Sequence, residues 1–374
     1  MNKRDFSGVN RIVVKVGSST LSHATGKLNL HRMEQLVREL ADLRNQGKEV
    51  VLVSSGAQAA GIGRLGLSRK PKTIPEKQAT AAVGQGILMH MYEKLFAEYG
   101  VIVAQVLLTR EDMSDRRRFL NARNALNALL DYHAVPVINE NDTIAIDEIK
   151  FGDNDTLSAM VAGLIDADLL IILSDIDGLF SANPQVDPEA VLIGEVNEIT
   201  SEIEQLAGGA GSNLGTGGMA TKLLAGRIAA NSGYPMVIAN GRKTGIIRRV
   251  AAGEPLGTLF LPRVNRLQAK KKWIAFGSSI QGKIIVDSGA GKALLERGKS
   301  LLPSGVVEVE GTFGIGNTVS VVCSGEEIAR GIVNYPSDEI VKIRGKKTSE
   351  IEKILGHKDY DEIVHRDNLV LSLH

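Results

Sequence analysis

The sequence predicts an α/β fold, a doubly wound and mostly parallel sheet, followed by a small β-rich domain. Up to about residue 261, short apolar strands alternate with helical patterns, as in doubly wound sheets. Several of these strands end in small polar or glycine-containing turns. After this point the apolar segments are short, β-branched and separated by Gly, Ser or Pro, which indicates a separate β-rich unit.

The composition excludes several classes of site and partner. At 374 residues the chain is long enough for two domains, and its net charge of +1 provides no strong field for a polyanion. Cys323 is the single cysteine, so an intrachain disulfide and a cysteine-based zinc site are excluded. The N-terminus lacks the apolar core of a signal peptide, and no apolar run reaches about 18 residues. We therefore expect a cytoplasmic protein without a membrane partner.

The first predicted strand, residues 11–16, contains a lysine among apolar residues and ends in a small polar turn. An ammonium group in such a strand is costly without an anionic partner, so Lys15 is a candidate phosphate contact. The alternative is an edge strand from which Lys15 reaches solvent. A helical pattern follows from residue 30, and the next strand, residues 49–53, opens into a turn that contains Ser55.

The central part of the sequence continues this alternation. Helical patterns at 78–99 and 116–132 flank a strand at 101–108, and a buried strand follows at 135–138. Two polar clusters come next, at residues 139–142 and 152–156, before a predicted helix at 157–167. Carboxylates and amides in these clusters suit a ligand with an ammonium group or a cation. Turn and helix-capping chemistry is the alternative interpretation.

Polar side chains at the ends of the strands are expected to converge, because the carboxyl ends of parallel strands meet at one edge of the sheet. Further strands are predicted at 168–173 and 236–239, and the first of them ends in Ser174 and Asp175. The residues expected to converge are Lys15, Ser55, Asp142 and Asp175.

The densest run of glycine, residues 208–222, leads into an alanine-rich helical pattern. Backbone amides at a helix start attract anions, and Lys222 in the first turn would reach the same anion, which predicts a phosphate site. The alternative is a glycine-rich surface loop. The P-loop pattern is absent from the sequence. The GxGxxG match at residues 61–66 begins too long after a strand to indicate a dinucleotide site.

Five ordered motifs resemble those of the glutamate 5-kinases, a group within the amino acid kinase family. They are KVGSS at 15–19, VSSGA at 53–57, VINEND at 137–142, GDND at 152–155 and GTGGMATK at 215–222. The region from 282 to about 360 resembles a PUA domain. The resemblance implies an amino acid kinase domain at 1–262, a linker at 263–281, a PUA domain at 282–360 and a C-terminal tail at 361–374.

The resemblance implies transfer of the γ-phosphoryl group of ATP to the side-chain carboxylate of L-glutamate, the first step of proline biosynthesis. Lys15 and Lys222 would hold the phosphates and Asp175 would orient both lysines. The implied ATP contacts are Lys15, Ser174, Asp175, Thr216, Gly217, Gly218, Met219, Ala220, Thr221 and Lys222. The implied glutamate contacts are Ser55, Asp142 and Asn154, with Asp153 and Asp155 nearby. Magnesium would be held mainly by the phosphates, without a protein metal site.

The resemblance also implies feedback inhibition by proline, a homo-oligomer (dimer or tetramer) and a functional link to glutamyl phosphate reductase. One competing hypothesis is a sister kinase with another acceptor. Another is RNA binding through the PUA domain, which contains the basic residues Lys342, Arg344, Lys346 and Lys347. The near-neutral charge and the 4% aromatic content argue against RNA, because few side chains are left to stack on bases.

Overall fold

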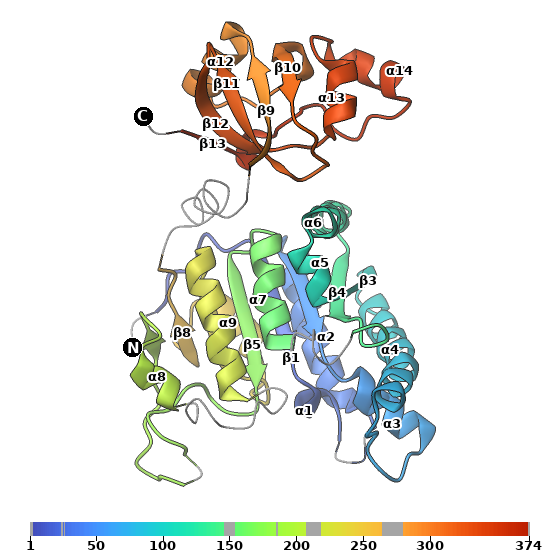
Figure 1. Cartoon of the computed structure of the whole chain (residues 1–374). Helices are drawn as coiled ribbons and strands as arrows, with labels where there is room; N and C mark the ends of the chain where they lie inside the picture. Colours follow the sequence, from blue (N-terminus) through green and yellow to red (C-terminus); the bar gives the residue numbers. More distant parts are fainter. Residues whose placement is uncertain are drawn as a thin grey trace. The chain divides into compact units, whose positions relative to one another are not determined.

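The computed structural model describes residues 3–23, 25, 27–145, 154–184, 186–206, 218–263 and 280–372. The chain divides into two compact units, Met1–Arg266 and Leu267–His374 (Figure 1). Most of the predicted linker at 263–281 lies outside the described residues. Among the described residues, no helix is both long enough and apolar enough to cross a membrane.

The first unit is built on an eight-stranded sheet with the order β3-β4-β2-β1-β5-β7-β8-β6. Its strands are β1 (Arg11–Val16), β2 (Glu49–Ser54), β3 (Val103–Leu108), β4 (Val135–Glu140), β5 (Leu169–Ser174), β6 (Glu195–Val196), β7 (Met236–Asn240) and β8 (Thr258–Phe260). The only antiparallel pairing among them joins β7 and β8, which confirms the predicted mostly parallel α/β sheet. Strands β6 and β8 are too short to produce a periodic pattern that the sequence could reveal.

Helices cover both faces of this sheet. They are α1 (Ser18–Leu21), α2 (Leu30–Asn45), α3 (Ala57–Leu65), α4 (Ile74–Ala97), α5 (Arg110–Ser114), α6 (Arg116–Asp131), α7 (Asn154–Leu164), α8 (Ser201–Leu206), α9 (Met219–Ser232) and α10 (Ile246–Ala251). Side chains of β1 alternate between two cores, because successive residues of a strand point to opposite faces. Ile12 and Val14 pack in the core with α2, α4 and α10, whereas Val13 packs in the core with α6, α7 and α9. Lys15 has the same parity as Val13 and therefore faces α7 and α9.

Helices α3 and α4 are in backbone contact. A Cβ atom added to Gly61 of α3 would lie 1.9 Å from the carbonyl oxygen of Thr80 in α4. A Cβ added to Gly84 of α4 would lie 1.7 Å from the carbonyl oxygen of Ala57, the first residue of α3. Gly61 is also the first glycine of the GxGxxG match. In this structure it allows the close approach of two helices.

The second unit contains a five-stranded sheet with the order β10-β9-β11-β12-β13. Its elements are β9 (Ile280–Val286), α12 (Ser288–Arg297), β10 (Val306–Glu310), β11 (Thr318–Cys323), β12 (Glu326–Ile332), α13 (Ser337–Ile343), α14 (Ile351–Leu355) and β13 (Leu369–Leu371). Strand β13 pairs with β12, so the predicted tail at 361–374 contributes an edge strand to this sheet.

Candidate active site

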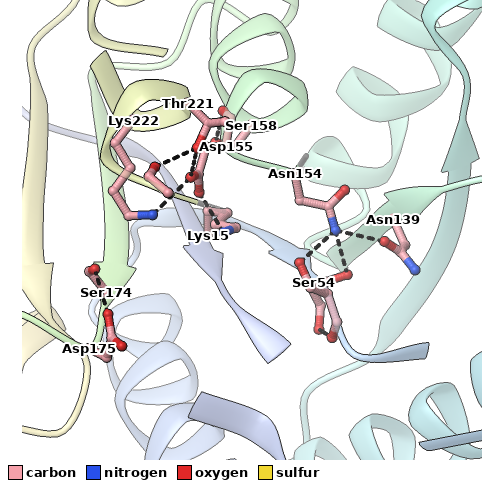
Figure 2. A network of polar contacts seen from close by, with 12 residues as sticks. Lys15, Ser54, Asn139, Asn154, Asp155, Ser158, Ser174, Asp175, Thr221 and Lys222 are labelled. Atoms are coloured by element: carbon pink, nitrogen blue, oxygen red, sulfur yellow. Dashed lines mark hydrogen bonds and ion pairs between the residues drawn. The ribbon is translucent and has the colours of Figure 1, made fainter. Parts of the chain in front are cut away.

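A buried carboxylate lies between two buried ammonium groups at the centre of the first unit (Figure 2). Asp155 Oδ1 is 2.5 Å from Lys15 Nζ, and Asp155 Oδ2 is 3.0 Å from Lys222 Nζ. The hydroxyl of Thr221 also lies 3.0 Å from Asp155 Oδ2. We call Lys15, Asp155, Thr221 and Lys222 the lysine cluster.

Three elements bring the lysine cluster together. Strand β1 points Lys15 toward the face that α7 and α9 cover, and these two helices lie side by side (Figure 1). Asp155 and Lys222 both belong to the first turns of their helices, α7 and α9. Strand β1 pairs with β2 on one side and β5 on the other, so the edge-strand alternative for Lys15 is wrong. The buried lysine instead has an anionic partner.

The charges in the lysine cluster favour an anionic ligand. Burial raises the pKa of Asp155, but the charges of Lys15 and Lys222 outweigh it and keep this pKa below the ordinary aspartate value. The carboxylate is therefore ionised at neutral pH and separates two groups that would otherwise repel each other. With both lysines protonated, the three charged side chains carry one net positive charge, which suits a phosphate.

A second polar group adjoins the lysine cluster and is centred on Asn154. Its amide nitrogen lies 2.8 Å from Ser55 Oγ, 2.8 Å from Asn139 Oδ1 and 3.3 Å from the carbonyl oxygen of Ser54. We call Ser54, Ser55, Asn139 and Asn154 the amide group. A backbone carbonyl can only accept, so the NH₂ of Asn154 must face Ser54. The side-chain oxygen of Asn154 consequently points away from Ser54 and Asn139 (Figure 2).

The carboxylate that contacts the two lysines differs from the one predicted to orient them. Asp175 follows the last residue of β5 and is exposed, and its described side-chain hydrogen bond is with Ser174 at 3.3 Å. Within the described part of the chain, the carboxylate in contact with both lysines is Asp155. The contacts make Asp155 a candidate for the orienting role, and the role of Asp175 stays a prediction. The family resemblance implied Asp175 for this role and placed Asp155 only near the glutamate contacts, whereas α7 begins at Asn154 and carries Asp155 in its first turn.

The remaining predicted site residues lie around these two groups or outside the described residues. Asp142 is half-buried in the turn after β4, close in sequence to Asn139. Ser174 is buried at the end of β5. Gly218 is the N-cap of α9 without a side-chain cap, and Met219 and Ala220 form its first turn with Thr221. Thr216, Gly217 and Asp153 lie outside the described residues.

The sequence interpretation missed Asn139 as a contact and missed α4 as a neighbour of the site. Asn139 Nδ2 donates to Gln85 Oε1 at 3.0 Å, and the Ser54 hydroxyl lies 2.7 Å from the Tyr92 hydroxyl. Gln85 and Tyr92 occur within an otherwise ordinary helical pattern, so no sequence signal distinguished them. In the ranges described above, no three His, Cys, Asp or Glu side chains are grouped closely enough to hold a metal ion.

The fold and the two polar groups define a phosphoryl-transfer enzyme, and comparison with known families agrees. The model of the amino acid kinase family matches residues 10–240, and the chain belongs to this family. A PUA domain model matches residues 282–355.

Its curated relatives are similar over nearly the full length of both chains. The glutamate 5-kinase of Moorella thermoacetica is 60% identical over 98% of this chain and 97% of the relative. The glutamate 5-kinase of Carboxydothermus hydrogenoformans is 60% identical over 98% of each chain. The glutamate 5-kinase of Caldanaerobacter subterraneus is 58% identical over 96% of this chain and 97% of the relative.

Proposed function

We propose that this chain transfers the γ-phosphoryl group of ATP to the side-chain carboxylate of L-glutamate, which forms L-glutamyl 5-phosphate, the first intermediate of proline biosynthesis. The observation that carries the proposal is the lysine cluster beside the amide group, since together they offer an anion site next to a polar acceptor site. The names of the relatives support glutamate as the acceptor.

On the donor side, Lys15 and Lys222 bind the phosphates of ATP. The first turn of α9 adds backbone amides. Its N-cap is a glycine, so no N-cap side chain competes with the phosphates for these amides. Ser174, Asp175 and the segment Thr216 to Lys222 complete the proposed ATP contacts. Displacement of the phosphoryl group concentrates negative charge between donor and acceptor, and the lysines stabilise this charge.

Magnesium fits this site as an ion held mainly by the phosphates. Both oxygens of Asp155 already face ammonium groups, so Asp155 is a poor metal ligand. The exposed carboxylate of Asp175 and the hydroxyl of Ser174 offer oxygen atoms at the end of β5. When bound, the ion adds positive charge at the transferred group.

The acceptor needs no general base. A glutamate side chain with a pKa of about 4.3 is already ionised at neutral pH, so it is a ready nucleophile. The chemical difficulty is the approach of one anion to another, and positioning together with positive charge overcomes it. Asp155 acts here through its charge and geometry, because its lowered pKa makes it a weak proton acceptor.

On the acceptor side, the orientation of Asn154 directs its side-chain carbonyl oxygen away from Ser54 and Asn139 (Figure 2). Such an oxygen accepts hydrogen bonds from an ammonium group, and Asp142 adds a negative charge nearby in sequence. Ser55 contributes a hydroxyl beside Asn154. These features favour an acceptor with a free α-amino group over an acylated amine or a nucleotide, the acceptors of a sister kinase.

Regulation and assembly follow from the family resemblance. Proline is the proposed feedback inhibitor, the proposed assembly is a homo-oligomer, and glutamyl phosphate reductase is the proposed recipient of the labile product.

An acceptor panel tests the proposed reaction. Purified protein is incubated with ATP, magnesium and hydroxylamine, which traps an acyl phosphate as a hydroxamate. Glutamate should give a hydroxamate, whereas aspartate and N-acetylglutamate should not. Product from another acceptor alone would replace glutamate in the proposal. Silence with every acceptor would favour the RNA-binding hypothesis, which salt-dependent RNA titration then examines.

A further inference from the structure

Helix α4 contacts both ends of the amide group through two side chains on one face. The hydroxyl of Tyr92 lies 2.7 Å from Ser54 Oγ, and Tyr92 is fully buried. Gln85 Oε1 accepts a hydrogen bond of 3.0 Å from Asn139 Nδ2. Positions 85 and 92 are two helical turns apart and so share one face of α4.

Each of these contacts restrains a partner of Asn154. Ser54 accepts from the Asn154 amide through its carbonyl oxygen, and its side chain is held by Tyr92. Asn139 accepts from the same amide through Oδ1, and its own amide is held by Gln85. The orientation of Asn154 is therefore fixed through two hydrogen-bonded chains that both end on α4.

The position of α4 is itself fixed against the acceptor side of the site. Gly84 lies one residue before Gln85 and allows the backbone of α4 to contact Ala57. Ala57 begins α3 directly after the turn at Ser55 and Gly56, and Gly56 has a left-handed φ of 108°. A displacement of α4 would consequently move the Ser54–Ala57 turn, because Gly84 contributes no flexible side chain to the contact with Ala57.

The neighbours of Tyr92 on this face of α4 are apolar. Leu88 and Phe96 are fully buried with Tyr92 in the core beneath β1 and β2. Burial raises the pKa of Tyr92 above its ordinary value, so its phenol stays neutral and works only as a hydrogen-bond partner. The described side-chain hydrogen bonds of Gln85 and Tyr92 run to the amide group and none runs to the lysine cluster.

We propose that Tyr92 and Gln85 are positioning residues that set the affinity for the acceptor amino acid without setting the affinity for ATP. They hold Ser54 and Asn139, which keep the side-chain oxygen of Asn154 directed toward the acceptor. This inference rests on the proposed function, since it concerns the acceptor pocket of the same site.

The experiment compares Tyr92→Phe with wild type in the full-length protein. The substitution keeps the ring and its packing and removes only the hydroxyl. The KM for glutamate should rise about fivefold, the effect of one hydrogen bond, while the KM for ATP stays unchanged. Tyr335→Phe is the matched control, because it removes the buried-ring hydroxyl that donates to the Tyr360 carbonyl oxygen in the second unit. Its KM values should both equal those of wild type.

A second pair of variants examines the hydrogen bonds that run from Gln85 through Asn139 to Asn154. Gln85→Met removes the acceptor that holds Asn139 and should raise the glutamate KM, whereas Gln85→Glu keeps an acceptor oxygen and should restore it. A double-mutant cycle of Ser54→Ala and Tyr92→Phe should be non-additive, since each single change breaks the same contact. If Tyr92→Phe unfolds, Ser54→Ala alone removes the same bond from the other side and tests the same prediction.

Two outcomes overturn the inference: an unchanged glutamate KM in Tyr92→Phe and Gln85→Met, or an equal rise in the KM for ATP. Wild-type protein that makes no hydroxamate from glutamate contradicts the proposed function instead. The variants are then compared on whichever acceptor of the panel is phosphorylated, so the positioning role is tested in either case.

Discussion

Asn154 and Asp155 are consecutive residues, yet their side chains belong to different polar groups (Figure 2). The amide of Asn154 lies 2.8 Å from Ser55 Oγ, whereas the carboxylate of Asp155 lies 2.5 Å from Lys15 Nζ. The first turn of α7 thus joins the amide group to the lysine cluster. In the proposed reaction this turn places the acceptor beside the transferred phosphoryl group, and each half can be tested separately.

Replacement of Asp155 by asparagine should destabilise the protein and impair catalysis. Asp155→Asn leaves Lys15 and Lys222 buried near each other without a compensating charge, so the free energy of unfolding should fall by about 3 kcal/mol. ATP should raise the melting temperature of the variant more than that of wild type, because phosphates replace the lost negative charge. Thermal unfolding with and without ATP measures both effects. Equal stability of variant and wild type would contradict the geometry of the lysine cluster.

Asp175→Asn is the matched variant for the carboxylate predicted to orient the lysines. Asp175 is exposed and its described side-chain contact is with Ser174, so this change should leave the free energy of unfolding nearly unaltered. A loss of stability as large as that of Asp155→Asn would favour Asp175 for the orienting role. Chemical denaturation of both variants under one condition makes the comparison.

Lys222→Ala should remain folded and lose most of its kcat. The change removes one positive charge from the transferred group, and the expected loss is about a hundredfold, as for one oxyanion-hole donor. Asp155 keeps Lys15 as a partner, so the buried carboxylate still has a positive charge beside it. Lys283→Ala is the control, since Lys283 is an exposed lysine paired with Glu310 in the second unit. Near-normal kcat in Lys222→Ala would remove Lys222 from the proposed mechanism.

Acid should remove the stability that Asp155 provides. Its folded-state pKa lies below the ordinary value of 3.8, so its contribution is complete above that value. The contribution is lost as the pH falls through the lower folded-state pKa, where the carboxylate takes up a proton. The difference in unfolding free energy between wild type and Asp155→Asn should therefore shrink as the pH falls below 3.8. A difference that is constant with pH would contradict the charge-based account.

The C-terminal segment should matter for the stability of the second unit. Ile363 is fully buried and its amide bonds to the carbonyl oxygen of Leu301, so Ile363→Ala should lower the free energy of unfolding by about 3 kcal/mol. Ile354→Ala is the matched control, because the Ile354 side chain is 38% exposed. Denaturant unfolding measures both variants. A loss from Ile363→Ala as small as the loss expected for the control would show that the segment is dispensable for stability.

Much of the sheet could be predicted from sequence because its central strands are buried and nearly continuous in apolar character. Once residues 11–16 are predicted to form a strand, the alternation of its side chains determines which face of the sheet Lys15 occupies. The start of α7 could not be predicted in this way. Asn and Asp are common caps, so the sequence favoured a cap where the packed structure continues the helix to Asn154.

The contacts of α4 depend on tertiary packing and left no local signal. Tyr92 fits an apolar helical stripe, and only its contact with Ser54 shows a polar role. In the sequence, Gly61 and Gly84 appear only as residues that weaken a helix. The backbone contact between α3 and α4 explains why glycine stands at both positions.

The most direct test of the central claim is the hydroxamate assay with glutamate, ATP and magnesium on wild type and Lys222→Ala at equal protein concentration. Wild type should give hydroxamate, and Lys222→Ala should give it at a rate about a hundredfold lower despite a native unfolding transition. Equal rates from the two proteins, or no hydroxamate from wild type, would contradict phosphoryl transfer to glutamate by the lysine cluster.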